Sequence, residues 1–132
     1  MSRDRSLFKI QGSKFKLLSN IEAISKKLSY NKDVTWVEPF MGSGTVGLNL
    51  AKGPAEFYDV NPYMIDFFNL IKSSDFTSKD LTLRLKSEQK NFSKIGSDHF
   101  YNLRQRFNET HCPIDFFVLN RTTHSGIVRF SK

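Results

Sequence analysis

The chain has 132 residues, of which 39% are hydrophobic and 14% aromatic, and this length suits at most one globular domain with a modest core. No apolar run reaches the roughly 18 residues of a membrane helix, and none follows the start as in a signal peptide, so we expect a cytoplasmic protein. The single cysteine, Cys112, excludes an intrachain disulfide and a cysteine metal cluster. His99 and His111 have no partners at metal-ligand spacing, so we expect no metal site.

The net charge of +7 is unevenly distributed. Residues 1–33 carry eight Lys/Arg and three Asp/Glu, residues 34–78 carry two and five, and residues 79–132 carry ten and five. An acidic centre between basic flanks fits a pocket for a cationic ligand between surfaces that meet phosphate. Lysines that only solvate helix faces would give the same count.

The first predicted element is a helix over residues 13–28, which follows a short extended entry. Apolar residues recur at helical spacing from Leu17 to Leu28, and Gly12 is placed to turn the chain before the helix.

The central stretch, residues 34–52, is typical of a strand, a glycine turn and a helix. The apolar strand from Val34 to Val37 breaks at Pro39, and a helix is predicted over residues 43–52. Gly42 and Gly44 have no Cβ, so the turn can adopt positive φ and let a ligand touch the backbone beside the helix start. The sequence therefore predicts a small-molecule site at this turn.

Two kinds of ligand are compatible with the turn. Residues 42–47 match the G-x-G-x-x-G fingerprint of dinucleotide-binding proteins, which alone is a weak signal. In that fingerprint the strand runs directly into the first glycine, whereas Glu38-Pro39-Phe40 intervenes here. A carboxylate at the strand tip favours a cationic or hydroxyl-bearing group over a pyrophosphate.

A second short strand, residues 55–59, ends in the carboxylate of Asp59, and a helix is predicted over residues 62–71. In a βαβ unit an acid at this position returns to the same sheet edge and accepts hydrogen bonds from ribose hydroxyls. The alternative for Asp59 is an N-cap for the helix that follows.

The string from Trp36 to Val46 resembles the first motif of the Dam-like (D12 class) adenine-N6 DNA methyltransferases, and Asp59-Val60-Asn61-Pro62 resembles their second. Gln11-Gly12-Ser13-Lys14 resembles the glycine-lysine turn that opens the family, although Gln11 and Ser13 depart from its usual form. The resemblance implies a Rossmann-like α/β methyltransferase fold, here incomplete, and S-adenosyl-L-methionine as cofactor. The cofactor-binding residues that it implies are Gln11, Gly12, Lys14, Glu38, Pro39, Phe40, Gly42, Ser43, Gly44, Thr45, Val46, Asp59, Val60 and Asn61.

Three further helices are predicted after residue 76. Thr77 and Asp80 form a capping-box pattern before a helix that Gly96 ends, and Ser97-Asp98 can cap the next. In the second helix Phe100, Leu103 and Phe107 are expected inward as ordinary core, with Arg104 and Arg106 elsewhere. Pro113 opens a mostly buried helix, and Ser125-Gly126 then turns the chain into a predicted strand over residues 127–131.

Leu119-Asn120-Arg121 and Gly126-Ile127-Val128-Arg129 resemble the segment that meets DNA in the same family. The DNA-binding residues that the resemblance implies are Asn120, Arg121, Thr123, His124 and Arg129. The two arginines suit this role, because arginine holds phosphate or reads guanine bidentately. We therefore expect a cofactor-binding part over residues 1–76 and the start of a helical target-recognition lobe over residues 77–132.

The family's catalytic string, Asp or Asn followed by two prolines and an aromatic residue, is absent from the chain. Asn61-Pro62-Tyr63 lacks the second proline and follows the wrong strand, so we assign no catalytic residue. We expect the N-terminal part of an adenine methyltransferase, inactive alone, with double-stranded DNA and the missing C-terminal portion or a second copy of the chain as partners. The alternatives are a non-catalytic cofactor- or DNA-binding module and a nicotinamide-dependent oxidoreductase.

Overall fold

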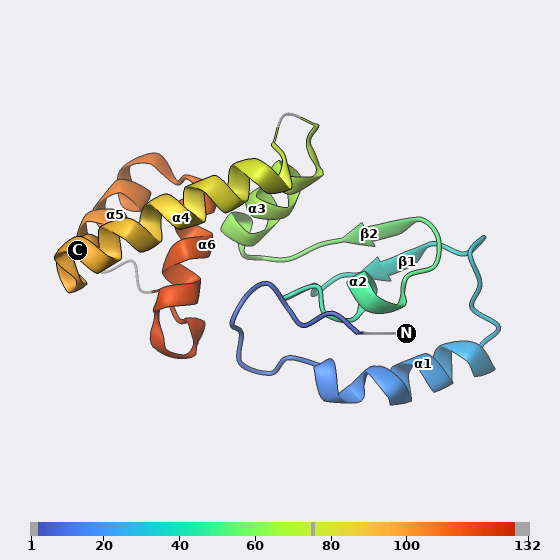
Figure 1. Ribbon diagram of the computed structural model, residues 1–132. Helices are drawn as coiled ribbons and strands as arrows, with labels where there is room; N and C mark the ends of the chain where they lie inside the picture. The colour runs from blue at the N-terminus through green and yellow to red at the C-terminus, as the bar shows by residue number, and fades with distance from the viewer. Residues whose placement is uncertain (1–2, 75, 129–132) are drawn as a thin grey trace. The chain divides into compact units, whose positions relative to one another are not determined.

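The computed structural model of the chain describes residues 3–74 and 76–128 (Figure 1). The chain forms two compact units, Met1–Val60 and Asn61–Lys132. Within the described residues, the longest helices are too short or too polar to cross a membrane.

The first unit contains a 3-10 helix η1 (Phe15–Leu17), helix α1 (Leu18–Lys27), strand β1 (Trp36–Glu38), helix α2 (Gly47–Leu50) and strand β2 (Ala55–Phe57). The two strands pair in parallel, with Trp36 opposite Ala55 and Glu38 opposite Phe57. The expected parallel arrangement of strand, glycine turn, helix and strand is thus confirmed.

The chain before α1 is fixed against α2 by side-chain hydrogen bonds. The Asn49 amide donates to the Asp4 carbonyl oxygen over 3.0 Å, and the Asp4 backbone N–H donates to Asn49 Oδ1 over 2.8 Å. Phe8 is buried, and Gly12 turns the chain with a φ of +80°, as the sequence predicted. The entry segment therefore reaches the glycine turn in a defined position.

Helix α2 is shorter and begins later than predicted. Residues 42–46 form the turn, so the helix starts at Gly47 where we expected it near Ser43. The left-handed φ of Gly42 and of Gly44 explains the delay, because two such residues interrupt the helical path. The chain then leaves the helix through Gly53, which lies so close to the Lys32 carbonyl that no Cβ fits there.

The second unit is helical, with α3 (Pro62–Lys72), α4 (Ser78–Ile95), α5 (Ser97–Thr110), α6 (Pro113–Thr122) and a 3-10 turn η2 (His124–Gly126). Local signals explain these bounds. Asn61 caps α3, the predicted capping box of Thr77 and Asp80 opens α4, and Gly96 ends α4 with a φ of +57°. Ser97 and Asp98 give α5 no side-chain cap, because Gly96 holds the N-cap position.

The core of the second unit is aromatic. The Phe67 ring of α3 stacks on Phe117 of α6 with centroids 4.7 Å apart, and Leu103 and Phe107 of α5 are fully buried. Because α3 packs on α6, it belongs to the same compact unit as the later helices, whereas we placed it before the expected boundary at residue 76. Phe107 of α5 and Phe116 and Phe117 of α6 are buried, as predicted, whereas Phe100 of α5 is only partly buried.

A network of charged side chains joins α4, α5 and α6. Asp115 is 1% exposed and accepts hydrogen bonds from Arg106 at 2.6 and 2.8 Å and from Arg84 at 2.9 Å. Glu88, which is 3% exposed, accepts from Arg106 at 2.9 Å and lies 2.5 Å from His99 Nε2. Buried carboxylates are tolerated when they are paired in this way.

We expected Arg106 away from the inward apolar residues of α5, and its side chain is indeed 39% exposed, but its pairing with two buried carboxylates was not predicted. The hydrogen bond to Asp115, and secondarily the one to Glu88, raises the pKa of Arg106 against the opposing effect of burial. Its spacing from Leu103 and Phe107 did not reveal these partners, because both carboxylates lie on other helices.

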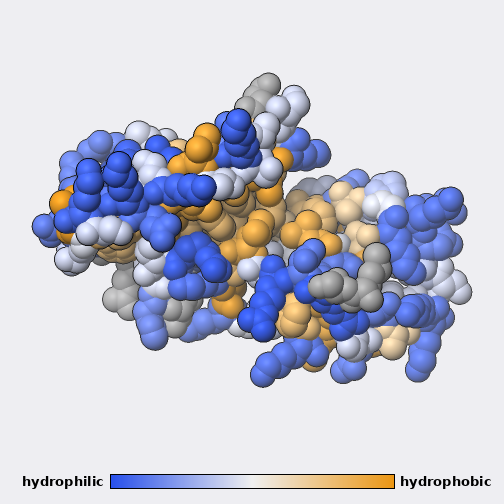
Figure 2. All heavy atoms as spheres, in the orientation of Figure 1, coloured by the Kyte–Doolittle hydropathy of each residue, from blue (hydrophilic) through white to orange (hydrophobic). Residues whose placement is uncertain are grey.

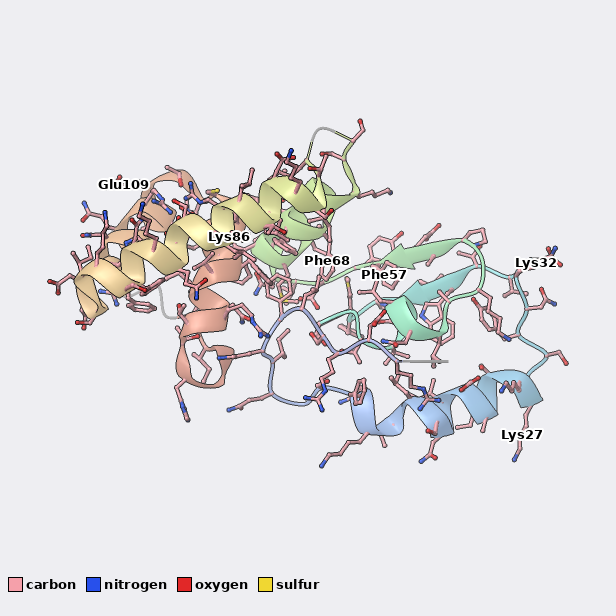
Figure 3. The ribbon with its side chains drawn as sticks, in the orientation of Figure 1. Lys27, Lys32, Phe57, Phe68, Lys86 and Glu109 are labelled. Atoms are coloured by element: carbon pink, nitrogen blue, oxygen red, sulfur yellow. The ribbon has the colours of Figure 1, made fainter. Side chains whose placement is uncertain are left out.

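Replacing Asp115 tests the network. We expect Asp115→Asn to lower the unfolding free energy by about 2–4 kcal/mol in urea denaturation, somewhat less than for a fully buried pair because both guanidiniums also reach water. The control is Glu109→Gln on the exposed face of α5 (Figure 3), expected to change stability by no more than about 0.5 kcal/mol. Equal stability of the two variants would contradict an organising role for the network.

Candidate functional site

A pocket of about 230 Å³ opens beside the glycine turn of the first unit. Three segments line it: the entry turn before α1, the end of β1, and the turn before α2. The lining residues are Ile10, Gln11, Gly12, Ser13, Lys14, Glu38, Phe40, Met41, Gly42, Ser43, Thr45 and Val46. Segments more than twenty residues apart in sequence, the opening turn and the first motif, thus line the same pocket.

Glu38 presents a carboxylate to the pocket from the end of β1. Side chains two residues apart in a strand share a face, so the Trp36 indole lies beside it and donates to Glu38 Oε1 over 2.8 Å. Oε2 has no hydrogen-bond partner within the described part of the chain. One oxygen is therefore held in place while the other remains available to a donor in the pocket.

Gly47 allows this carboxylate to lie against α2. A Cβ at residue 47 would lie 2.7 Å from Glu38 Oε1 and would also overlap the ring of Phe57 of β2. The helix can approach the strands this closely only with glycine at its first position. We gave Gly47 no role beyond the dinucleotide fingerprint, in which the third glycine serves helix packing.

The glycine turn is tied to the chain that follows β2. Met41 donates its backbone N–H to the Tyr58 carbonyl over 2.8 Å, and Gly42 donates its own to Asp59 Oδ2 over 2.7 Å. An amide bonded to a carboxylate is a charge-assisted hydrogen bond, which is stronger than a neutral one. The carboxylate thus stabilises the backbone of the turn on which the pocket is built.

Asp59 does not itself line the pocket. The residue that caps the following helix is Asn61, where the sequence had offered Asp59 as an alternative. Asn61 Oδ1 accepts from the Tyr63 N–H over 3.1 Å at the start of α3, in the second unit. Val60, which is 96% exposed, is also absent from the lining, as are Pro39 and Gly44.

The remaining lining residues are chemically mixed. The hydroxyls of Ser43 and Thr45 are buried and lie 2.6 Å apart, whereas the Phe40 ring is 90% exposed. Lys14 donates from Nζ to the Gly12 carbonyl over 3.1 Å. A carboxylate, a lysine, two hydroxyls and an exposed aromatic ring suit a ligand that has both charges, hydroxyl groups and a flat ring.

Three lining residues escaped our sequence reasoning: Ile10, Ser13 and Met41. Each directly adjoins a residue that we did select. Because a turn contributes consecutive residues to a pocket, their adjacency to Gln11, Lys14 and Gly42 was the signal that could have identified them.

The residues predicted to contact DNA lie at the end of α6 and in η2. Arg121 and His124 are exposed and Thr123 is partly exposed. Asn120 is 3% exposed, and its Nδ2 donates to the Gly126 carbonyl over 2.8 Å, so its amide closes the turn from within. Ile127 and Val128 are not in a strand, and Arg129 and the rest of the predicted strand lie outside the described residues.

Comparisons with known proteins show which family and which relatives the chain resembles in sequence. Residues 11–132 match the model of the family described as D12 class N6 adenine-specific DNA methyltransferase. The chain is 31% identical to a DNA adenine methylase of Serratia marcescens, across 99% of the chain and 47% of the relative. Relatives of the same name from Escherichia coli K12 and Vibrio cholerae are each 27% identical, over 45% and 46% of their lengths. The chain thus spans about half the length of these curated relatives.

The Gly47→Ala variant shows whether close packing or helix propensity decides the effect of a side chain at the first position of α2. Alanine in an exposed helix stabilises by about 0.5–1 kcal/mol relative to glycine, but the overlap with Phe57 and Glu38 should reverse the sign and cost about 1–3 kcal/mol. Thermal unfolding with calorimetric analysis measures the change. Gly42→Ala is the comparison: its Cβ meets nothing within 4 Å, so only its left-handed φ costs free energy, about 1–2 kcal/mol. A Gly47→Ala variant more stable than the parent would refute the packing argument.

Proposed function

Since the chain belongs to the D12 class of N6 adenine-specific DNA methyltransferases, we propose that its first unit binds S-adenosyl-L-methionine in the pocket beside Glu38. The two-stranded parallel sheet and its glycine turn would then be part of a Rossmann-like methyltransferase fold. The observation that supports this proposal is the carboxylate of Glu38, which lines the pocket and has one oxygen held by Trp36.

The donor set fits this cofactor. Glu38 can accept hydrogen bonds from ribose hydroxyls, and it lowers the free energy of a nearby sulfonium by charge attraction. Lys14 can pair with the amino-acid carboxylate, Phe40 offers its exposed ring to the adenine, and Gly42 leaves the backbone open to close approach. The sequence also predicts a ribose contact for Asp59, but since it does not line the pocket, we propose that it acts behind these residues, through Gly42.

When bound, S-adenosyl-L-methionine supplies an activated methyl group. The reaction proposed for the whole enzyme would be in-line methylation of the exocyclic amine of an adenine flipped out of duplex DNA, with S-adenosylhomocysteine as the leaving group and one proton released from the amine. The chain's contribution is to bind and orient the cofactor and to contact the duplex. The string that would accept hydrogen bonds from the target amine is absent from these 132 residues, so we propose that transfer requires it from another polypeptide segment.

The second unit is the proposed DNA-contacting part. Arg121 and His124 project from the end of α6 and from η2, and Asn120 fixes the turn between them through Gly126. A fixed turn can place side chains in a groove with little further loss of conformational entropy. Arg129 remains a sequence-based member of this set.

Isothermal titration with S-adenosylhomocysteine tests the cofactor proposal. We expect the chain to bind it and Glu38→Gln to weaken binding by about 1.5–3 kcal/mol, or roughly 10- to 150-fold, because a hydrogen bond to a charged acceptor is lost. Glutamine can still accept from Trp36, so the turn should persist. Glu56→Gln on β2 is the control for the change in charge and should bind as the parent does.

Titration with NAD tests the alternative ligand for the same pocket. Gly47 meets the packing requirement of the third glycine in the dinucleotide fingerprint, so this ligand is a fair alternative. Binding of NAD without binding of S-adenosylhomocysteine would replace the methyltransferase assignment of the pocket.

The Arg121→Gln variant tests whether the end of α6 contacts DNA. We expect it to weaken binding to a preferred duplex, selected from a random pool, by about 1–3 kcal/mol when measured by fluorescence anisotropy. Lys72→Gln, an exposed residue in the last turn of α3, makes the same change in charge and should leave affinity nearly unchanged. Equal losses in the two variants would remove Arg121 from the recognition surface.

A further inference from the structure

Four lysines form a stripe along α4. Lys79, Lys86, Lys90 and Lys94 are all exposed. At about 100° per residue they fall within an arc of roughly 80°, on the side opposite the buried Glu88. Figure 2 shows hydrophilic side chains along this helix, and Figure 3 labels Lys86 on it. We call these four residues the α4 lysine stripe.

The carboxylates of α4 do not neutralise the stripe. The helix has two acids, Asp80 and Glu88. Asp80 is engaged with Thr77 in the capping box, and Glu88 is buried with Arg106 and His99. The stripe therefore keeps its positive charge at the surface of the unit.

The spacing of the stripe works against the helix. Lys86, Lys90 and Lys94 follow one another at intervals of four residues, where like charges repel and destabilise a helix. Helix α1 shows the stabilising arrangement at the same spacing, with Lys26 Nζ 2.9 Å from Glu22. Lys94 lies in the last turn of α4, where the helix dipole favours a cation, but this does not account for Lys86 and Lys90. A polyanion lying along the stripe would turn the repulsion among these lysines into an attraction.

The dimensions of the stripe suit a nucleic-acid backbone. From Lys79 to Lys94 the helix advances about 22 Å at 1.5 Å per residue, a length over which one DNA strand presents about six phosphates at 3.4 Å each along the axis. Lysine is a flexible point charge with three donors, so it contacts phosphates regardless of base sequence.

We propose that the α4 lysine stripe is a sequence-independent contact surface for DNA phosphates, separate from the turn at the end of α6. This inference rests on the proposed function for the identity of the polyanion. Its expected effect is on affinity and salt dependence, and discrimination between sequences is left to the turn.

The experiment compares two triple variants with equal net charge. Lys86→Gln, Lys90→Gln and Lys94→Gln together remove most of the stripe, whereas Lys16→Gln, Lys27→Gln and Lys32→Gln remove three exposed lysines of the first unit. Fluorescence anisotropy of labelled duplexes of several sequences, each measured at a series of salt concentrations, gives the affinity and its salt slope. Circular dichroism and thermal unfolding establish that both variants are folded.

We expect the stripe variant to reduce the magnitude of the slope of log affinity against log salt by about 2–3, since each neutralised phosphate contributes about 0.9. The fold loss of affinity should be the same for every duplex sequence, and the slope of the first-unit variant should stay close to that of the parent.

Three outcomes would overturn the proposal. Equal slopes for the two variants would remove the stripe from the DNA surface while leaving the duplex binding of the chain intact. A loss confined to one duplex sequence would make the stripe part of sequence recognition. Binding of the parent to vesicles with anionic lipids, without binding to any duplex, would reassign the stripe to a membrane surface and would also defeat the DNA part of the proposed function.

Discussion

The hydrogen bond from the Gly42 N–H to Asp59 is the constraint on which the pocket depends. It joins the turn after β1 to the chain after β2, and the Tyr58 backbone strengthens the junction by accepting from Met41 and donating to Glu38. A turn with two left-handed glycines is flexible by itself, because glycine restricts the backbone least. Asp59 restrains the turn through this bond, and Trp36 holds one oxygen of Glu38 at the adjoining strand end. The acid that the sequence assigned to a ligand contact therefore supports the turn that lines the pocket.

In the second unit a paired-charge core has the corresponding role. Asp115 lies in the first turn of α6 and is held by arginines from α4 and α5, while Asn120 near the end of the same helix closes the following turn through Gly126. Apolar packing alone tolerates sliding of one helix along another, whereas bonded charges fix register. The helix that presents Arg121 is thus located at both ends by polar groups, and its middle is located by aromatic packing.

Local chemistry made much of this fold predictable. The capping box at Thr77, the stop at Gly96 and the proline that opens α6 each determine a helix end from within a few residues, and the structure confirms them. Contacts between distant residues were harder to predict. The bond of Asp59 to Gly42 and the pairing of Arg106 with Asp115 depend on tertiary packing, which periodicity does not encode. Helix α2 was overestimated for a related reason: an apolar pattern continued through residues whose glycine dihedral angles prevented a helix.

Because of the ion-pair network among α4, α5 and α6, the net charge counted along the sequence does not show where charge lies on the surface. Residues 79–132 carry ten basic and five acidic side chains, but two of the arginines and two of the acids neutralise one another within the helical core. Such internal pairs add little to the field that an approaching polyanion meets, since opposite charges a few ångströms apart cancel at longer range. The field comes from lysines and arginines whose side chains reach solvent away from carboxylates. A charge count along the sequence can therefore indicate a basic lobe, but only the pairing pattern locates the surface at which that charge acts.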